Sequence, residues 1–469
     1  MSILSDDLYA SACEENGVNS EMEIMQWLAL MQKKYNYSVS KVALDALTGW
    51  EINANLGDIV HESGKFFSIR GLNVEISGGL KKEWQQPIID QPEIGVLGFI
   101  AKKINGILHV LVQAKMEPGN VNMVQLSPTV QATRSNYTMV HGGKRPLYIE
   151  YFLGKKKPPV LYDQLQSEQG TRYFKKRNRN IIVEIPENFE LEQNPNFIWM
   201  TIGQIQRFTR YENLVHLDCR SILGGLSYTV GGGVRLAKPL NVGFGARVFE
   251  SITSDLNAGE NDHRQILSWL AGLKFSLEVR ASFIPLRDVK GWEHDCGEIR
   301  HKDNKFFSVI GVSVNAENRE VSNWMQPLVK SKDGGIIGLI CQMRSGILHV
   351  LVQGLAEPGL IDILELAPTV QCTPENYSDD VPAYVELLRS GRLEKKVVFD
   401  SILSEEGGRF FHSQQRHLIV EINTDQHITL EPNYCWMTFR QFQEFGRYNT
   451  HLNIEMRSIM SCVSPLIRE

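Results

Sequence analysis

The sequence predicts an α+β protein built from two copies of one domain. Residues 106–113 and 346–353 both read GILHVLVQ, and each copy is followed after three residues by EPG. A second phrase is nearly repeated, as LSPTVQATRSNY at 126–137 and LAPTVQCTPENY at 366–377. Short alternating segments predict strands, and amphipathic segments elsewhere predict helices. We therefore expect a mixed sheet flanked by helices in each half.

The repeat covers most of the 469 residues. Paired residues lie 242 positions apart at Trp27, 240 apart at Tyr137 and 237 apart at Arg172. Small changes in spacing are typical of loop insertions in a duplicated domain, whereas solenoids repeat every 20–50 residues or so. We expect a first repeat at 20–223, a glycine-rich linker at 224–261 and a second repeat at 262–461.

Each repeat begins with a predicted helix. Ser20 and Glu23 have the spacing of a capping box, and Ile24, Trp27, Leu28 and Met31 follow on one face. Asp262 and Gln265 precede the same pattern in the second repeat. The tryptophans on these faces are expected to lie in the core.

The predicted strands follow in the same order in both repeats. They are KFFSI and KFFSV, GVLGFIA and GIIGLIC, the ILHVLVQ pair, and IIVEI and LIVEI. In ILHVLVQ, His109 lies between apolar neighbours, as does His349 in the second copy. We interpret both histidines as buried structural residues rather than catalytic ones.

The composition excludes several classes of protein. A formal net charge of −5, with 42% hydrophobic and 22% charged residues, argues against broad binding to nucleic acid or to a membrane surface. No apolar run approaches the roughly 20 residues of a membrane-spanning helix. The acidic N-terminal segment does not resemble a secretory signal, and seven cysteines without a CxxC pair favour a cytoplasmic protein with reduced thiols and no metal site.

Polar side chains follow the ILHVLVQ strand at a turn. In QAKMEPGN, Pro118 and Gly119 predict a turn that holds Lys115 and Glu117 at a sheet edge, where ligands often bind. The second repeat retains Glu357 but has Leu355 in place of the lysine. Alternatively, the glutamates only cap the turn.

The PTVQ phrases end in uncharged hydrogen-bonding side chains suited to a sugar or a pyrimidine. They are Gln131, Thr133, Asn136 and Tyr137 in the first repeat and Gln371, Thr373, Asn376 and Tyr377 in the second. Beyond them the first repeat is basic, with Arg134, His141, Lys144 and Arg145, whereas the second is acidic, with Glu375, Asp379 and Asp380. A diphosphate would therefore prefer the first loop, unless the charges are merely solvated.

A third paired segment repeats this asymmetry. SEQGTRYFKKRNRN at 167–180 has four basic residues after Tyr173, while SEEGGRFFHSQQRH at 404–417 has one arginine and two histidines after Phe410. Arg172 and Arg409 follow a glycine turn and could each hold a phosphate or carboxylate. An ion pair at the edge of the core is the alternative interpretation.

Together, VQAKMEPGN, QLSPTVQATRSNY, HGG, SEQGTRYFKKRNRN and ELAPTVQCTPENY resemble the NDP-hexose 2,3-dehydratase family over almost the whole chain. The resemblance implies a tandem duplication of a Nudix-like fold acting on dTDP-4-keto-6-deoxy-D-glucose. The metal box of Nudix hydrolases has only a faint echo in SILSEEGG and LQSEQG, so we expect the fold without hydrolysis.

The resemblance also implies a mechanism that requires no cofactor. The C4 ketone acidifies the C3 proton, a base removes that proton, and the C2 hydroxyl leaves as water. Glu117 or His141 could be the base and Lys115 or Tyr137 the donor to the enolate oxygen. The residues expected to bind substrate are Gln113, Gln131, Thr133, Arg134, Asn136, Tyr151, Arg172, Lys176 and Arg177.

We expect the first repeat to hold the working site and the protein to form a homodimer. The second-repeat candidates are Glu357, Gln371, Asn376, Tyr377 and Arg409. Two other functions remain open: a non-catalytic nucleotide-sugar-binding module and a nucleotide-diphosphate hydrolase. No GxGxxG, P-loop, HExxH or GxSxG motif supports a nicotinamide, phosphate-loop, zinc-protease or serine-hydrolase function.

Overall fold

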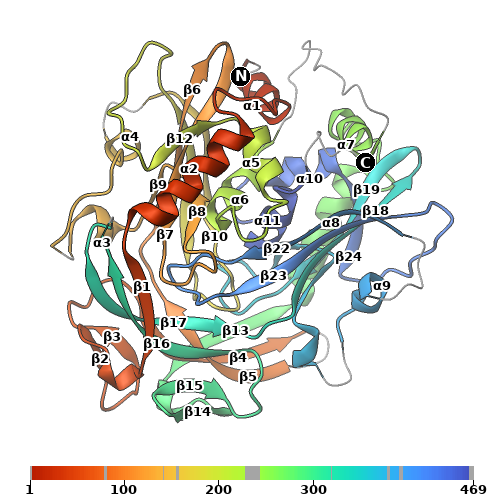
Figure 1. Ribbon diagram of the computed structural model, residues 1–469. Coiled ribbons are helices and arrows are strands. Elements are labelled where there is room, and N and C mark those ends of the chain that lie inside the picture. Colours follow the sequence, from red (N-terminus) through yellow and green to blue (C-terminus); the bar gives the residue numbers. More distant parts are fainter. Residues whose placement is uncertain are drawn as a thin grey trace.

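The computed structural model describes residues 3–78, 82–140, 142–154, 158–227, 243–317, 319–377, 381–389 and 395–463, and it is a mixed α+β structure as predicted. Two seven-stranded sheets stand on either side of a central group of helices, and two five-stranded sheets lie beneath them (Figure 1). No helix in the described ranges is long and apolar enough to cross a membrane.

Each seven-stranded sheet is built from strands of one repeat. In the first, the order is β10 (Val160–Ser167), β11 (Arg177–Glu184), β6 (Gly95–Ile104), β7 (Ile107–Met116) and β12 (Phe197–Met200), with β8 (Val124–Ser127) beside β7 and β9 (Val130–Ala132) beside β6. In the second, the order is β22 (Lys395–Ser404), β23 (Gln414–Ile422), β18 (Gly335–Arg344), β19 (Ile347–Leu355) and β20 (Glu365–Ala367), with β21 (Val370–Cys372) beside β18 and β24 (Tyr434–Thr438) beside β19. Both sheets are mixed, because β6 and β11, like β18 and β23, run parallel.

The five-stranded sheets exchange strands between the repeats. β1 (Tyr37–Val42) of the first repeat pairs with β16 (Phe307–Ala316), and β13 (Glu278–Ile284) of the second pairs with β4 (Ser68–Ser77). The other members are β2 (Trp50–Ile52), β3 (Ile59–His61) and β5 (Lys82–Asp90), and β14 (Trp292–Asp295), β15 (Glu298–His301) and β17 (Asn323–Ser331). Neither five-stranded sheet is therefore complete without the other repeat.

The helices also occur in corresponding pairs. They are α2 (Glu21–Lys34) and α8 (His263–Ser276), α5 (Ile202–Phe208) and α10 (Phe439–Gly446), α6 (Leu217–Gly224) and α11 (Ile454–Met460), and α4 (Glu150–Leu153) and α9 (Val385–Arg389). The short helix α3 (Arg134–Tyr137) corresponds to the 3-10 turn η3 (Pro374–Asn376), and η1 (Leu44–Ala46) to η2 (Leu286–Asp288). Both predicted capping boxes, Ser20 with Glu23 and Asp262 with Gln265, are confirmed.

One pair of helices was not predicted from the sequence. Residues 244–253, expected to be part of the linker, form α7 (Phe244–Thr253), and α1 (Ile3–Ala12) is its counterpart. The Ser11 hydroxyl donates to Leu108 O and the Ser251 hydroxyl to Leu348 O, both at 2.6 Å. Their sequences, ILSDDLYASA and FGARVFESIT, have little in common, so only the packing shows their equivalence. The rest of the glycine-rich segment, 228–242, lies outside the described residues.

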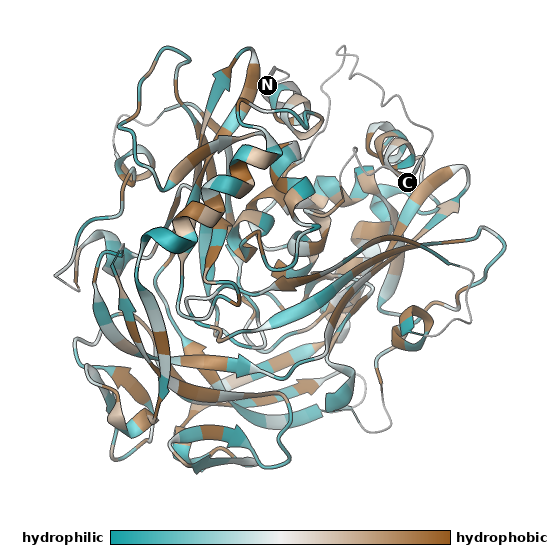
Figure 2. Ribbon diagram, viewed as in Figure 1, coloured by the Kyte–Doolittle hydropathy of each residue, from teal (hydrophilic) through white to brown (hydrophobic). Residues whose placement is uncertain are grey.

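The doubled phrase GILHVLVQ forms a buried strand in each seven-stranded sheet, as β7 and β19, and Figure 2 shows brown, hydrophobic stretches among teal ones in these sheets. His109 and His349 are 3% and 0% exposed. In each, Nε2 accepts a backbone N–H at 3.0 Å, from Val18 or Glu260, and Nδ1 lies 2.9 Å from the carbonyl two residues earlier. The prediction of two structural histidines is confirmed.

The two repeats meet through their EPG turns. The Gly119 N–H donates to Gly407 O at 2.8 Å, and the Gly359 N–H donates to Gly170 O at 2.7 Å. A β-carbon on Gly119 would overlap the Phe410 carbonyl, and one on Gly359 would overlap the Tyr173 carbonyl. The EPG phrase is present twice because each copy packs, backbone against backbone, on the SEQG or SEEG loop of the other repeat.

Replacing Gly119 with alanine should separate these backbones. We expect Gly119→Ala to lower the free energy of unfolding by about 3 kcal/mol or more, because the clash is with main chain that cannot rotate away. Gly272→Ala is the control, since Gly272 is exposed in α8 and a β-carbon there meets nothing within 4 Å. It should be neutral or stabilise by roughly 0.5–1 kcal/mol. Denaturant unfolding of both variants would measure the difference.

Candidate active site

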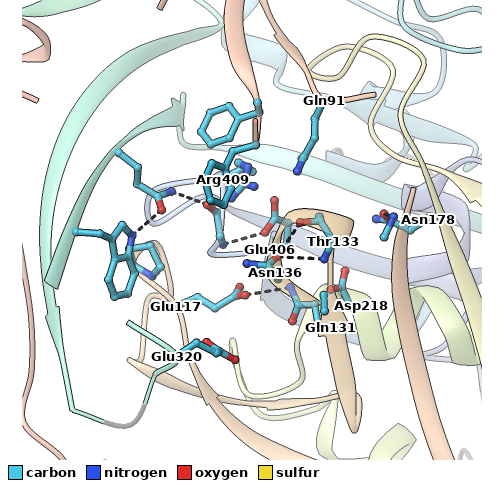
Figure 3. Close-up of a pocket in the computed structure, with 18 of the residues that line it drawn as sticks. Gln91, Glu117, Gln131, Thr133, Asn136, Asn178, Asp218, Glu320, Glu406 and Arg409 are labelled. Carbon is cyan, nitrogen blue, oxygen red and sulfur yellow. Dashed lines mark hydrogen bonds between the residues drawn. The ribbon is translucent and has the colours of Figure 1, made fainter. Parts of the chain in front are cut away.

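A cavity of about 250 Å³ opens beside β7 and β9 and is closed by the second repeat. The first repeat contributes the polar side chains of Lys115, Glu117, Gln131, Thr133, Asn136 and Asp218. The second contributes Arg319, Glu320, Trp324, Gln326, Glu406 and Arg409. In Figure 3, Glu406 and Arg409 face Glu117 and Gln131 across this space. The candidate site is therefore a composite of both repeats.

Glu117 and Lys115 lie side by side on the floor of the cavity. Lys115 Nζ donates to Gln131 Oε1 at 2.8 Å and lies 3.7 Å from Glu117 Oε1. Gln131 Nε2 donates to Glu117 Oε1 at 3.0 Å. The Glu117 carboxylate thus contacts side chains, while its backbone carbonyl closes the turn by accepting from Asn120 N–H. The alternative that this glutamate side chain only caps the turn is wrong.

His216 fixes the ionisation of Glu117. The Asp218 N–H donates to His216 Nδ1 at 3.1 Å, which places the imidazole proton on Nε2, and Nε2 donates to Glu117 Oε2 at 2.8 Å. Burial by itself would raise the pKa of Glu117, but the field and hydrogen bond of His216, with Lys115 and Arg319, outweigh burial and lower it. Glu117 is therefore an ionised carboxylate with 4% exposure.

Other carboxyl groups around the cavity have pKa values above their usual range. Burial is the largest cause that raises the pKa values of Asp218, Glu168 and Glu406, and for Glu406 the value is about 8. Glu117 raises the pKa of Glu406 further, while Arg409 and a hydrogen bond from Tyr173 lower it. One ionised carboxylate beside carboxyl groups with raised pKa values is an arrangement suited to acid–base chemistry.

Unsatisfied polar atoms face the cavity. Gln91 Nε2, Glu168 Oε2 and Arg409 Nε have no hydrogen-bond partner among the described residues, although all three are buried. Buried polar atoms without a hydrogen-bond partner are rare in folded proteins, because each one lowers the stability of the fold unless a ligand or water binds it. Gln91 points into the cavity in Figure 3. These atoms indicate a polar ligand.

Aromatic side chains also form part of the wall of the cavity. Trp50, Phe66 and Phe67 come from the first repeat and Trp324 from the second. Trp324 Nε1 donates to Gln326 Oε1 and Gln326 Nε2 donates to Gly408 O, both at 2.8 Å. This chain of bonds joins the aromatic wall to the loop that carries Glu406. A flat ring and a polar, anionic group could therefore bind at one site.

The structure corrects the placement of two arginines. Arg409, predicted as a second-repeat residue, lines the first-repeat cavity and lies over the Phe67 ring, 4.2 Å from its centroid. Arg172, predicted for the first-repeat site, lies instead over Phe307, 4.3 Å from its centroid. The reason is the exchange between the repeats, because each SEQG or SEEG loop packs against the other repeat's EPG turn.

The remaining predicted residues divide into three groups. Lys115, Glu117, Gln131, Thr133, Asn136 and Lys176 line the cavity. Five others do not, namely Gln113, Arg134, Tyr137, Tyr151 and Arg177. Arg134 is exposed, and the tyrosines pack against another apolar cluster. Arg177 begins β11 and is followed by Asn178, which lines the cavity from the other face of the strand. His141 lies outside the described residues.

In the second repeat, the equivalent side chains make a different network. Gln371 Nε2 donates to Glu357 Oε1 at 3.1 Å, while Asn376 Oδ1 accepts the Phe306 N–H at 2.9 Å. Tyr377 is 42% exposed. Asn453 occupies the position of His216 and donates to Gln371 instead of the glutamate. Burial, with the field of Glu365, raises the pKa of Glu357 to about 7. The two EPG glutamates therefore differ in charge state.

The sequence prediction missed His216, Asp218, Glu406 and Arg319. A signal for the first two exists, because HLDCRSIL at 216–223 and NIEMRSIM at 453–460 share the arginine but differ at the positions of His216 and Asp218. Glu406 is equivalent to Gln169 in the first repeat, so the two copies of this repeated segment differ in charge at this position. Arg319 carried no signal. Among the described residues, no group of three or more His, Cys, Asp or Glu side chains is arranged to hold a metal ion.

The family model for NDP-hexose 2,3-dehydratase matches residues 21–226 and again residues 263–463. The chain belongs to this family. The two matched regions correspond to the two repeats of the structure, each with its own seven-stranded sheet.

Curated relatives named dTDP-4-dehydro-6-deoxy-alpha-D-glucopyranose 2,3-dehydratase are similar to this chain over nearly their full length. The relative from Saccharopolyspora spinosa is 40% identical over 98% of this chain and 94% of its own. The relative from Amycolatopsis orientalis is 38% identical with the same coverage, and that from Streptomyces violaceoruber is 39% identical over 94% of this chain and 96% of its own.

The buried carboxyls of this family member should make its stability depend on pH. Glu357 and Glu406 have pKa values of about 7 and 8, above the usual value near 4.3 of an unfolded glutamate, so the folded chain keeps protons that the unfolded chain releases. The contribution of these two groups to the free energy of unfolding should therefore fall from pH 5 to pH 8, by up to about 1.4 kcal/mol per pH unit for each. The lowered pKa of Glu117 has the opposite effect only at more acidic pH.

Thermal unfolding at constant ionic strength would measure this dependence. The melting temperature of the wild type should fall between pH 5 and 8 relative to that of the Glu357→Gln/Glu406→Gln double variant. A melting temperature of the wild type that rises across this window relative to that of the double variant would contradict the assigned protonation states.

Proposed function

We propose that this chain removes water from C2 and C3 of a dTDP-4-dehydro-6-deoxyhexose in the cavity of its first repeat. The names of the curated relatives and the family match support this activity. The observation that carries the assignment of the site is the buried pair of an ionised Glu117 and Lys115 beside unsatisfied polar atoms. The product is a dTDP-linked 3,4-diketo-2,6-dideoxyhexose.

The chemistry needs a base, a donor to the enolate and an acid. The C4 ketone makes the C3 proton acidic, and the negative charge that forms on its removal rests on the C4 oxygen. The C2 hydroxyl is β to the ketone and leaves as water, after which the enol becomes a diketone. The net change is loss of water, so the steps require no redox cofactor.

Glu117 is the proposed base for the C3 proton. It is ionised, buried and held by His216 and Gln131, so its orientation is set before substrate binds. Its lowered pKa reduces its basicity, and exclusion of water from the filled cavity offsets part of this loss. Lys115 is the proposed donor to the enolate oxygen, because burial lowers the pKa of its ammonium group and thereby strengthens it as a donor.

The nucleotide end of the substrate is proposed to lie toward Arg409 and the aromatic wall. Arg409 is held over Phe67 and has a free Nε among the described groups, so a diphosphate oxygen could accept from it. Trp50, Phe67 and Trp324 could enclose the thymine ring. Lys176 at the cavity adds positive charge, although burial lowers its pKa to about 8.

Three further expectations belong to the same proposal. Each repeat is Nudix-like, the enzyme forms a homodimer, and it works in the cytoplasm in deoxysugar biosynthesis for natural products. The composition, the reduced cysteines and the sequence resemblance support them. Size-exclusion chromatography with light scattering would test the dimer.

Replacing Glu117 tests the base directly. Glu117→Gln should lower kcat by a factor on the order of 10² to 10⁴, because the amide cannot accept the C3 proton, and should leave dTDP binding largely intact. The assay is formation of the deoxygenated product from the 4-keto sugar nucleotide, with dTDP affinity measured by calorimetry.

Glu357→Gln is the matched control, because Glu357 is the same EPG glutamate in the other repeat. It should retain most of the activity. Near-wild-type turnover by Glu117→Gln would move the base elsewhere, and saturable dTDP binding without any wild-type turnover would favour a binding module.

The positions of Arg409 in the first-repeat cavity and Arg172 outside it allow a second test of the proposed site. Arg409→Lys keeps the charge but loses the planar guanidinium over Phe67, so we expect about tenfold weaker dTDP binding. Arg172→Lys changes the equivalent arginine, which lies outside this cavity, and should leave the affinity at the catalytic cavity unchanged. Competition by dTDP against turnover reports that cavity alone; equal effects of the two substitutions would argue against the composite site.

A further inference from the structure

We infer that Glu406, supplied by the second repeat, is the general acid that protonates the departing C2 hydroxyl, and that Tyr173 of the first repeat positions it. This inference rests on the proposed function and adds the acid that the reaction needs. It means that the first-repeat site lacks a reacting group until the second repeat packs against it.

The position of Glu406 fits this role. Tyr173 Oη donates to Glu406 Oε1 at 2.6 Å, and the Gly408 N–H donates to Glu406 Oε2 at 2.8 Å. A β-carbon placed on Gly408 would lie 2.8 Å from Glu406 Oε2 and 3.5 Å from Glu117 Oε1. The two carboxyl groups therefore flank one small space in the cavity wall, as an acid and a base acting on the neighbouring atoms C2 and C3 require.

The surroundings keep Glu406 protonated at neutral pH. Burial and the field of ionised Glu117 raise its pKa to about 8, and Glu168 adds to this effect, while Arg409 and the Tyr173 hydrogen bond oppose it. Asp218 also lines the cavity with a raised pKa, but its Oδ2 lies 3.8 Å from His216 Nδ1, on the side of the network that orients Glu117. Glu406 is the protonated group on the other side of that space.

The second repeat shows what the site looks like without the acid. At the equivalent positions Glu406 is replaced by Gln169, Tyr173 by Phe410 and Gly408 by Thr171. The Tyr173 and Phe410 rings meet near the boundary between the repeats, with centroids 5.8 Å apart. One copy thus has a proton donor, its hydrogen-bonding tyrosine and a glycine, whereas the other has an amide, a phenyl ring and a threonine at the equivalent positions.

The proton balance is complete with these groups. Glu117 takes the C3 proton, the C2–O bond breaks, and the Glu406 proton joins the leaving hydroxyl to form water. Tautomerisation then moves a proton from the C3 enol oxygen to C2 through solvent. Glu117 releases its proton and Glu406 regains one, so the enzyme ends in its starting state.

The test uses Glu406→Gln, which introduces the residue that the second repeat already has. We expect kcat for water loss to fall by a factor on the order of 10² to 10⁴, with dTDP affinity within about threefold of wild type. In D₂O, proton NMR should show that this variant still exchanges the C3 hydrogen of the substrate, because Glu117 can still form the enolate. Glu117→Gln should lose both exchange and elimination, and a sample without enzyme sets the background.

The pH profile separates an acid from a base. Wild-type kcat should fall as pH rises through about 8, where Glu406 loses its proton. Tyr173→Phe should move this limb to higher pH, because the tyrosine hydrogen bond lowers the pKa of Glu406. Glu405→Gln is the control in the same loop, since Glu405 does not line the cavity and one of its buried oxygens has no partner among the described residues.

The outcomes distinguish the two levels of the proposal. Wild-type protein that neither exchanges C3 hydrogen nor releases water overturns the proposed function. If the wild type is active, three results for the Glu406→Gln variant would overturn the assignment of Glu406 alone. The variant could keep the wild-type kcat, it could lose C3 exchange, or its melting temperature and dTDP affinity could fall together with its activity. A wild-type kcat that rises through pH 8 also overturns it.

Discussion

The reciprocal backbone contact between the two repeats is the constraint on which the rest of this structure depends. The Gly119 N–H bonds to Gly407 O, and the Gly359 N–H bonds to Gly170 O, with no room for a side chain on Gly119 or Gly359. The EPG turn of each repeat packs against a loop of its partner repeat. The residues that follow this loop therefore face the sheet of the repeat that carries the turn. The first-repeat cavity consequently receives Glu406 and Arg409, which lie 289 and 292 residues after Glu117 in the chain.

The two repeats differ in the ionisation of the buried glutamate in their EPG turns. Isolated carboxylates are expensive to bury, so each must lose its charge or gain a partner. Glu117 gains His216, Lys115 and Arg319 and stays ionised. Glu357 has Asn453 and Leu355 at the equivalent positions, and its pKa rises instead. A few substitutions around one shared turn therefore give one copy an ionised carboxylate and leave the other with a carboxyl that titrates near neutral pH.

Much of the fold could be predicted because its signals are local. The capping boxes at Ser20 and Asp262, the alternation in ILHVLVQ and the constant spacing between copies depend on residues close in sequence. Lys115, Glu117 and Gln131 could be found because they follow strands and turns with recognisable patterns. Helix α7 escaped notice because its counterpart α1 shares packing with it rather than sequence.

The sequence by itself determined that this chain is a duplicated α+β domain of the NDP-hexose 2,3-dehydratase family, with the basic complement in the first copy. Only the tertiary structure decided which side chains share a cavity. Strand exchange and the crossed loops place Arg172 against one repeat and Arg409 against the other, contrary to their order along the chain. The physical reason is that the two repeats are related by pseudo-symmetry, so that a loop of each repeat packs against the sheet of the other. The repeated sequence shows that two copies exist, but it does not show which copy a loop contacts.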